Sequence, residues 1–240
     1  MLTKSQVKYI QSLGHKKFRD DADCFVAEGP RLMGEWLQDK RVKFQAIYAT
    51  QNWIAANPGA PATEVSEMEL EKISQLQQPN QVLALVEKWK YDLPGAPSGE
   101  NYLALDAIQD PGNLGTIIRI ADWFGWKHIL CQPDTADMYN PKVVQASMGS
   151  VARVQLHYLP LRQWFDNYPG LRVYGADLQG KDIRRMEPLR DSVLLIGNEG
   201  NGISADLMER VNVKVTIPKM GEAESLNAAV ATGILLSHLS

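Results

Sequence analysis

A glycine-rich loop that carries one carboxylate is the first place in this sequence where chemistry could occur. Residues 197–202 read GNEGNG and directly follow the apolar run 193–196. The glycines permit positive φ angles and close approach of the backbone to a ligand. Glu199 would repel a phosphate and favours a hydroxyl group or a cation, and the loop lacks the Lys-Ser/Thr pair of a Walker loop. It can also be interpreted as a tight structural turn.

A second polar loop contains an asparagine and precedes an arginine. Residues 110–115 read DPGNLG, with Pro and Gly in the order that a type II turn prefers. Asn113 is predicted to cap the helix that begins there. Arg119 lies further along the same helix, where it could serve a substrate or form an ordinary surface ion pair.

A third loop leads into the last helix. Residues 217–227 read IPKMGEAESLN, and Ser225 is predicted to cap the helix, with Asn227 in its first turn. A polar side chain beside a buried helix start needs a hydrogen-bond partner, which the structure alone could supply.

Other common motifs of enzyme chemistry are absent. The four histidines, at 15, 128, 157 and 238, lack the spacing of zinc ligands. No Gly-x-Ser-x-Gly elbow and no GxGxxG after a strand occur. The sequence therefore disfavours a metal site, a covalent hydrolase and a nucleotide-dependent oxidoreductase.

The elements that position the three loops alternate between apolar runs and helical patterns. Strands are predicted at 102–108, 128–131, 154–159, 171–176, 192–196 and 213–217, with helices at 113–124, 141–148 and 225–239. This order implies an α/β domain with a mostly parallel sheet and helices on both faces. Because ligands bind at the carboxyl ends of such strands, the site is expected at loops 109–115, 177–182, 197–203 and 218–225.

The first half of the chain is predicted to be a separate small α/β domain. Helices are expected at 4–13, 30–38 and 66–76, and strands at 25–27, 44–49 and 82–86. The Pro- and Gly-rich residues 93–100 are typical of a linker. The predicted division is thus 1–92, linker 93–100, and 101–240.

Composition narrows the class of protein. The chain has 240 residues, is 45% hydrophobic and 22% charged, and carries a net charge of −3, as expected of a globular protein with a sizeable core. It shows no secretory signal and no apolar stretch near the ~20 residues of a membrane span, so we expect a cytoplasmic protein. Cys24 and Cys131 are predicted to be buried thiols.

Taken together, the motifs resemble those of the SpoU-type RNA ribose methyltransferases. The resemblance rests on DPGNLGTIIRIADWFG (110–125), LLIGNEGNGIS (194–204) and IPKMGEAESLNAAVATGIL (217–235), in that order and spacing. YNPKVVQASMGS (139–150) is also similar to the family, and FVAEGPRLMGEW (25–36) is similar to the RNA-binding domain that many members carry. One departure is Lys219, which separates Pro218 from Met220.

The resemblance implies a fold, a cofactor and a reaction. The fold is a trefoil-knotted α/β domain, and the reaction transfers a methyl group from S-adenosylmethionine to a ribose 2′-hydroxyl, without a metal. The family's functional residues fall at catalytic positions Arg119, Asn113, Glu199, Ser225 and Asn227, and at cofactor-binding positions Gly197, Ile217 and Leu226. Guanidinium groups have pKa values above about 12, so the role of Arg119 stays open between a base and a group that positions phosphate and hydroxyl.

The resemblance also implies partners. The substrate is structured RNA, with ribosomal RNA favoured over transfer RNA, and the family forms homodimers with each site near the interface. The first nineteen residues hold five basic side chains and no acid. If the substrate is RNA, we expect its phosphate backbone to be contacted by Lys16, Lys17, Arg19 and Arg31. The alternative is a non-catalytic RNA-binding or ribosome-assembly protein with the same fold.

Overall fold

The computed structural model describes residues 1–240 as two compact units. The first unit comprises Met1–Lys90 together with Asp137–Ala152, and the second comprises Tyr91–Ala136 together with Arg153–Ser240. Residues 93–100 contain no helix or strand. No helix in the structure has both the length and the apolar character needed to cross a bilayer.

The first unit is built on a mixed sheet with the strand order β1-β4-β2-β3. Strand β4 pairs antiparallel with both β1 and β2, and β3 pairs parallel with β2. The strands are β1 (Cys24–Glu28), β2 (Phe44–Ala49), β3 (Thr63–Glu64) and β4 (Val82–Glu87). The helices are α1 (Lys4–Ser12), α2 (Lys16–Ala22), α3 (Pro30–Trp36), α4 (Gln51–Ala56), α5 (Glu67–Ile73) and α7 (Pro141–Ser147).

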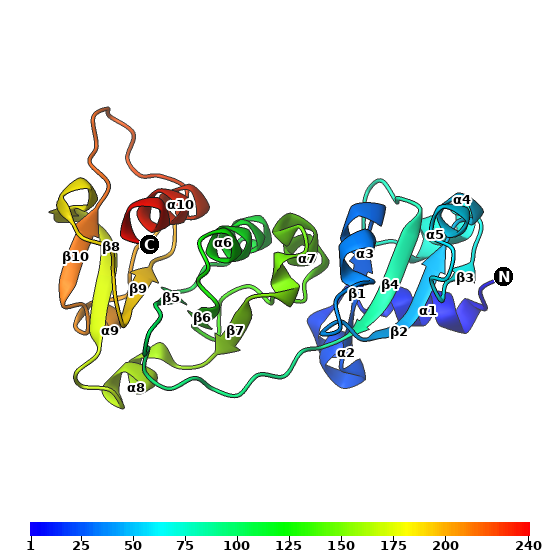
Figure 1. The fold of residues 1–240 in the computed structure, drawn as a ribbon, viewed down its shortest axis with the longest axis horizontal. Helices are drawn as coiled ribbons and strands as arrows, with labels where there is room; N and C mark the ends of the chain where they lie inside the picture. The colour runs from blue at the N-terminus through cyan, green and yellow to red at the C-terminus, as the bar shows by residue number, and fades with distance from the viewer. The chain divides into compact units, whose positions relative to one another are not determined.

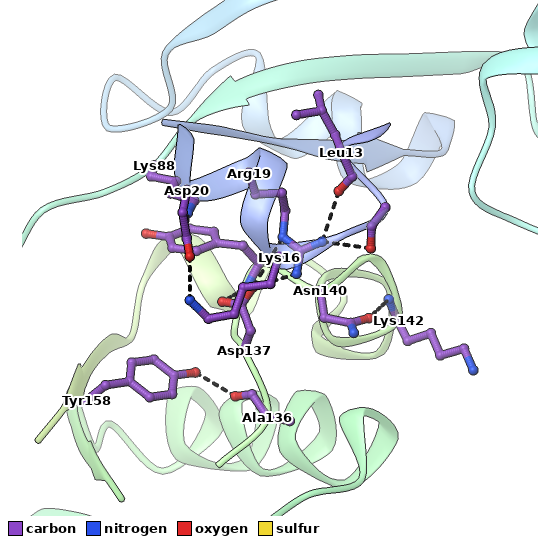
Figure 2. A network of polar contacts seen from close by, with 12 residues as sticks. Leu13, Lys16, Arg19, Asp20, Lys88, Ala136, Asp137, Asn140, Lys142 and Tyr158 are labelled. Carbon is purple, nitrogen blue, oxygen red and sulfur yellow. Dashed lines mark hydrogen bonds and ion pairs between the residues drawn. The ribbon is translucent and has the colours of Figure 1, made fainter. Parts of the chain in front are cut away.

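Helix α7 is the part of the first unit that comes from the second half of the sequence. Tyr139, just before it, packs among Phe25 and Trp89 with ring centroids 4.9 and 6.0 Å away. The preceding Asp137 forms an ion pair with Arg19 of α2, at 2.6 Å (Figure 2). Arg19 also donates to the carbonyl of Leu13, at 2.9 Å. These contacts anchor residues 137–152 to α2 and β1.

The second unit contains a six-stranded sheet in which every pairing is parallel, with the order β10-β8-β9-β5-β6-β7. This confirms the predicted α/β class. The strands are β5 (Tyr102–Leu105), β6 (His128–Cys131), β7 (Gln155–Tyr158), β8 (Arg172–Asp182), β9 (Ser192–Ile196) and β10 (Val213–Thr216). The helices are α6 (Pro111–Trp123), α8 (Leu161–Asp166), α9 (Ala205–Met208) and α10 (Ala228–Leu239). The trefoil knot stays a prediction.

Helices cover both faces of this sheet (Figure 1). On one face, strand residues such as Ala104 and Leu195 pack with Trp164 of α8 and Leu207 of α9. On the other face α6 and α10 lie side by side. They run in the same direction, because Asn227 bonds to Asn113 at their starts and Trp126 bonds to Ser240 at their ends. Both helices therefore begin at the same end of the sheet.

Some predicted elements differ from the observed ones. Residues 177–182, expected to be a loop, continue β8, which pairs with β10 across a register shift between Lys214 and Val215. Four helices were not predicted: α2, α4, α8 and α9 span only four to seven residues each, too few for a helical period to be recognised. Cys24 and Cys131 are buried free thiols, as predicted.

A stacked pair of histidines lies on the neighbouring strands β6 and β7 of the second unit. His128 Nδ1 and His157 Nε2 are 3.2 Å apart, and the rings stack with centroids separated by 5.4 Å. Tyr91 packs on His157, and Glu100 lies 3.7 Å from His128. Burial lowers the pKa of His157 to about 4, and the neighbouring His128 acts in the same direction.

We predict that this pair makes the protein less stable in mild acid. An unfolded histidine titrates near 6.5, so between pH ~6.5 and ~4 the unfolded chain binds a proton that folded His157 does not, and the free energy of unfolding falls as the pH is lowered. The expected loss at His157 is roughly 3 kcal/mol. Urea denaturation across this pH range should show a flatter profile for His157→Gln. Equal slopes for His157→Gln and wild type would contradict the prediction.

Candidate active site

The candidate site forms where β5 and β9 end and where α6 and α10 begin. Strands β5 and β9 are neighbours, with Leu105 opposite Ile196. The backbone N–H of Asp106 donates to the carbonyl of Ile196 at 2.9 Å, which extends the pairing by one residue. The loop that leads into α6 and the glycine loop after β9 therefore leave the sheet side by side, as expected of parallel strands.

The carboxamide of Asn113 joins all three loops. Its Nδ2 donates to Oε1 of Glu199 at 2.5 Å, and its Oδ1 accepts from Nδ2 of Asn227 at 2.9 Å. The bonded residues are 86 and 114 positions apart in the sequence. Three of the five predicted catalytic residues are thus brought together by direct hydrogen bonds.

The electrostatics of this arrangement suit the carboxylate. Asn113 lies in the first turn of α6 and Asn227 precedes α10, so Glu199 lies where two parallel helices begin. Helix N-termini carry partial positive charge and stabilise anions. Only Oε1 of Glu199 is bonded, which leaves Oε2 able to accept from a hydroxyl or a guanidinium.

The glycine loop closes on itself as a narrow turn. Asn198 and Gly202 exchange two backbone hydrogen bonds, of 3.0 and 2.9 Å. A side chain at Gly197 would collide with the backbone of Gly202 and Ile203, so only glycine fits at this position. The interpretation as a tight turn is therefore correct for the backbone, and the turn holds Glu199 toward Asn113.

Two residues that sequence reasoning missed hold this turn in place. Asn198 Nδ2 donates to the carbonyl of Ala107 at 2.7 Å, and its Oδ1 accepts from the N–H of Gly200 at 2.9 Å. The buried Asp106 accepts from the N–H of Ser204 at 2.6 Å. Asn198 could have been identified from the sequence because it lies next to Glu199 in a glycine loop. Asp106 has no neighbouring sequence feature that would have identified it.

The predicted helix caps were wrong in both loops. Asp110, not Asn113, is the N-cap of α6, and its side chain accepts from the N–H of Asn113 at 2.8 Å. Pro111 is the first residue of the helix rather than part of a type II turn. Asn227, not Ser225, is the N-cap of α10 and accepts from Ala229 and Val230. These caps leave the Asn113 side chain free to bond across the site.

Arg119 and Ser225 point to solvent instead of joining the network. Both are exposed, and neither makes a hydrogen bond or ion pair within the chain. Arg119 lies on the exposed side of α6, two turns from its start. Its guanidinium therefore has all of its donors available for a substrate.

The predicted cofactor-binding positions surround the same loops. Gly197 and Ile217 are half-buried at the ends of β9 and β10, and Leu226 is 45% exposed. No hydrogen bond within the chain involves residues 218–226. The free main-chain donors and acceptors of this loop fit a ligand that is bound mainly through the backbone.

The residues predicted to contact RNA differ in their exposure. Lys17 and Arg31 are exposed and have no partner, whereas Lys16 is exposed and pairs with Asp20 at 2.6 Å. Arg19 is 1% exposed, and its guanidinium donates hydrogen bonds to Asp137 and to two backbone carbonyls. This burial argues against the predicted contact between Arg19 and RNA.

This chain is similar to known rRNA methyltransferases. The SpoU rRNA Methylase family model matches residues 100–237, and the MRM3-like substrate binding domain model matches residues 4–84. A 23S rRNA (guanosine(2553)-2′-O)-methyltransferase, RlmP of Bacillus subtilis, is 32% identical over 98% of this chain and 95% of its own length.

Two solved structures with bound S-adenosylmethionine are also similar. An rRNA methyltransferase from Sinorhizobium meliloti has a TM-score of 0.86 and 34% identity, covering 100% of this chain and 95% of that one. The SpoU methyltransferase AviRb from Streptomyces viridochromogenes has a TM-score of 0.85 and 25% identity, covering 99% and 97%. With a family model that matches more than half of its residues and a relative aligned along nearly its whole length, this chain belongs to the SpoU rRNA methylase family.

Proposed function

We propose that this S-adenosylmethionine-dependent rRNA 2′-O-methyltransferase acts on a guanosine of 23S rRNA, with Arg119 at the reacting hydroxyl. The observation that carries the proposal is the bonding of Asn113 to Glu199 and Asn227, which joins the three family motifs in one network. The base and the RNA are inferred from RlmP, which aligns with nearly all of this chain.

The chain's own residues have two tasks in this reaction. When bound, S-adenosylmethionine supplies an electrophilic methyl group. The protein must hold the 2′-oxygen in line with that methyl and accommodate the proton that the hydroxyl loses as the new O–C bond forms. Gly197, Ile217 and Leu226 would hold the cofactor through their backbones.

Arg119 positions the RNA. Its unpaired guanidinium can donate to a phosphate with one edge and to the 2′-oxygen with another, which fixes the ribose relative to the cofactor. Oε2 of Glu199 is the acceptor available in the Asn113 network for the hydroxyl or for Arg119. Ser225, in the loop before α10, is assigned to the shape of the cofactor loop.

The first unit supplies RNA-backbone contacts through Lys17 and Arg31, both exposed and unpartnered. Lys16 can join them by exchanging Asp20 for a phosphate, since an exposed ion pair contributes little stability. These lysines and arginines steer the RNA without reading its sequence.

A homodimer is the second part of the proposal. Helix α10 is mainly apolar and has no polar face along its length, a pattern that favours burial, yet Val230 is 52% exposed. On the adjacent α6, Trp123 is 84% exposed and lies one turn after Arg119. A second copy that covers these side chains would place its surface next to Arg119.

The overall reaction is tested by mapping 2′-O-methyl groups in unmodified 23S and transfer RNA after incubation with the protein and S-adenosylmethionine. We expect one modified guanosine in 23S rRNA. Methylation confined to transfer RNA, or cofactor binding without transfer to either RNA, would overturn the proposal, and the second result would favour a non-catalytic assembly protein.

Removing the Arg119 side chain should slow transfer without affecting the cofactor. Arg119→Ala is expected to lower kcat/KM for 23S rRNA by about 10²–10³-fold, the usual effect of losing one charge-stabilising donor, and to leave cofactor affinity unchanged by calorimetry. The control is Arg172→Ala, an exposed arginine at the start of β8, at the other end of the strands. Equal activity of the two variants would remove Arg119 from the reaction.

The direction of the Asn113–Glu199 hydrogen bond can be tested by exchanging its ends. Asn113→Asp replaces the donor with a second carboxylate, so we expect a loss of about 1–3 kcal/mol in the free energy of unfolding. The double variant Asn113→Asp/Glu199→Gln restores one donor to the pair and should recover most of this stability. The control is Asn212→Asp. Oδ1 of Asn212 only accepts a hydrogen bond, from the N–H of Val173, and an aspartate can still accept it, so this variant should lose little stability. If the double variant is no more stable than Asn113→Asp, the bond does not hold the site together.

The dimer is tested by sedimentation. The wild type should sediment at about twice the chain mass of 26.8 kDa, and Val230→Lys should shift it to the monomer because the charge would be buried unpaired. Leu93→Lys changes an exposed leucine outside α6 and α10 and should leave the mass unchanged. A monomeric wild type would refute the assembly.

A further inference from the structure

Exposed carboxamide side chains gather at one end of the sheet in the first unit. Strands β1 and β2 end there and β4 begins there, because Glu28 lies opposite Leu83 and Ala49 opposite Val82. We call this surface the amide edge; it consists of Gln51, Asn52, Gln77, Gln78, Asn80 and Gln81. All six are exposed, and none of their side chains has a hydrogen-bond partner within the chain.

The loop that carries most of the amide edge is held at both ends. The carboxylate of Glu28, 5% exposed, accepts from the hydroxyl of Ser74 at 2.5 Å and from the N–H of Gln75 at 2.7 Å. At the other end, the carbonyl of Gln81 accepts from the N–H of Thr50 at 2.8 Å. Burial raises the pKa of Glu28, and a buried carboxylate is costly unless it is hydrogen-bonded. The buried carboxylate of Glu28 therefore holds one end of a loop whose exposed carboxamide side chains have no hydrogen-bond partner.

The backbone at Gln81 is strained. Its φ is +56°, a conformation that glycine or asparagine adopts at less cost than glutamine. Strained residues persist where the surrounding structure holds them, and they concentrate at binding sites. Stability alone would favour glycine here, so the glutamine side chain is the feature to explain.

The chemistry of the amide edge matches an unpaired base. A carboxamide presents a donor beside an acceptor, which pairs with the donor and acceptor edge of a base that is not in a helix. Arg31, exposed and unpartnered after Gly29, adds a positive charge for a phosphate. Among residues 28–31, 50–52 and 74–82, the only acid is the buried Glu28, so no exposed carboxylate in these segments repels RNA.

We propose that the amide edge binds unpaired bases of the rRNA substrate and thereby contributes to the choice of the nucleotide that is methylated. Glu28 is a positioning residue for this surface. The inference rests on the proposed function for the identity of the RNA, and its test uses binding rather than methyl transfer.

The experiment is a thermodynamic cycle between protein and RNA. Short transcripts that tile 23S rRNA are screened for binding, and in the tightest one each unpaired nucleotide is replaced in turn by an abasic ribose. We expect at least one replacement to weaken binding to the wild type by about tenfold, the scale of one amide–base contact. For Gln77→Ala/Gln78→Ala the same replacement should have no further effect, because the partner is already lost.

The matched control is Gln38→Ala/Gln45→Ala, two exposed glutamines of the same unit placed after α3 and at the other end of β2. This variant should keep the full abasic penalty. Binding of no tile, or an unchanged penalty in Gln77→Ala/Gln78→Ala, would overturn the inference. A lost penalty without methyl transfer to any rRNA would refute the proposed function and support the base-binding surface.

Glu28 is tested in the same cycle. Glu28→Ala removes the acceptor for both Ser74 and Gln75 and should lower the abasic penalty although every amide is still present. Glu28→Gln keeps one acceptor and should restore part of it. An undiminished penalty in both variants, with circular dichroism showing folded protein, would remove Glu28 from the positioning of the loop.

Discussion

The site depends on what one primary amide can do. A carboxamide donates and accepts in the same plane without carrying charge, so Asn113 can serve a carboxylate with one atom and a second amide with the other. An aspartate has no donor for Glu199, and a serine hydroxyl is shorter than the span that Asn113 bridges. Asn113 lies near the start of the second unit and its partners lie 86 and 114 positions later, so this side chain links an early segment of the unit to two late ones.

The parallel sheet makes that meeting possible. All six strands point the same way, so the loops after β5, β9 and β10 leave from one edge. Helices α6 and α10 both start at this edge, and their partial positive charges face the only carboxylate of the network. The first unit has a mixed sheet instead. The loops at one end of that sheet carry the neutral carboxamides of the amide edge.

Features of this structure that depend on residues close together in the sequence were predicted better than those that depend on residues far apart. Strands β2, β6 and β9 were predicted residue for residue, because each is a short, mainly apolar run between polar residues or glycine. The helix caps were wrong because Asp110 and Asn113 are both good caps and lie within one turn of each other.

Contacts between distant residues escaped prediction. Arg19 belongs to a basic run, and its burial depends on Asp137, which is 118 positions away. The residue types of the site followed from motif resemblance, but their bonds did not, since spacing along a chain does not specify which amide faces which carboxylate. Asp106 and Asn198 were missed for the same reason: their partners lie 98 and 91 positions away.

Residues 137–152 belong to the first unit although residues 91–136 of the second unit precede them in the sequence, and this order affects when the first unit is completed during synthesis. Domains usually fold as units during synthesis, from the N-terminus, at about 5–20 residues per second. When Lys90 has just been synthesised, Phe25 and Trp89 still lack their partner Tyr139, and Arg19 still lacks its partner Asp137. These contacts can form only after β5, α6 and β6 have been translated. The first unit is therefore completed only after a segment of the second unit, residues 91–136, has been synthesised.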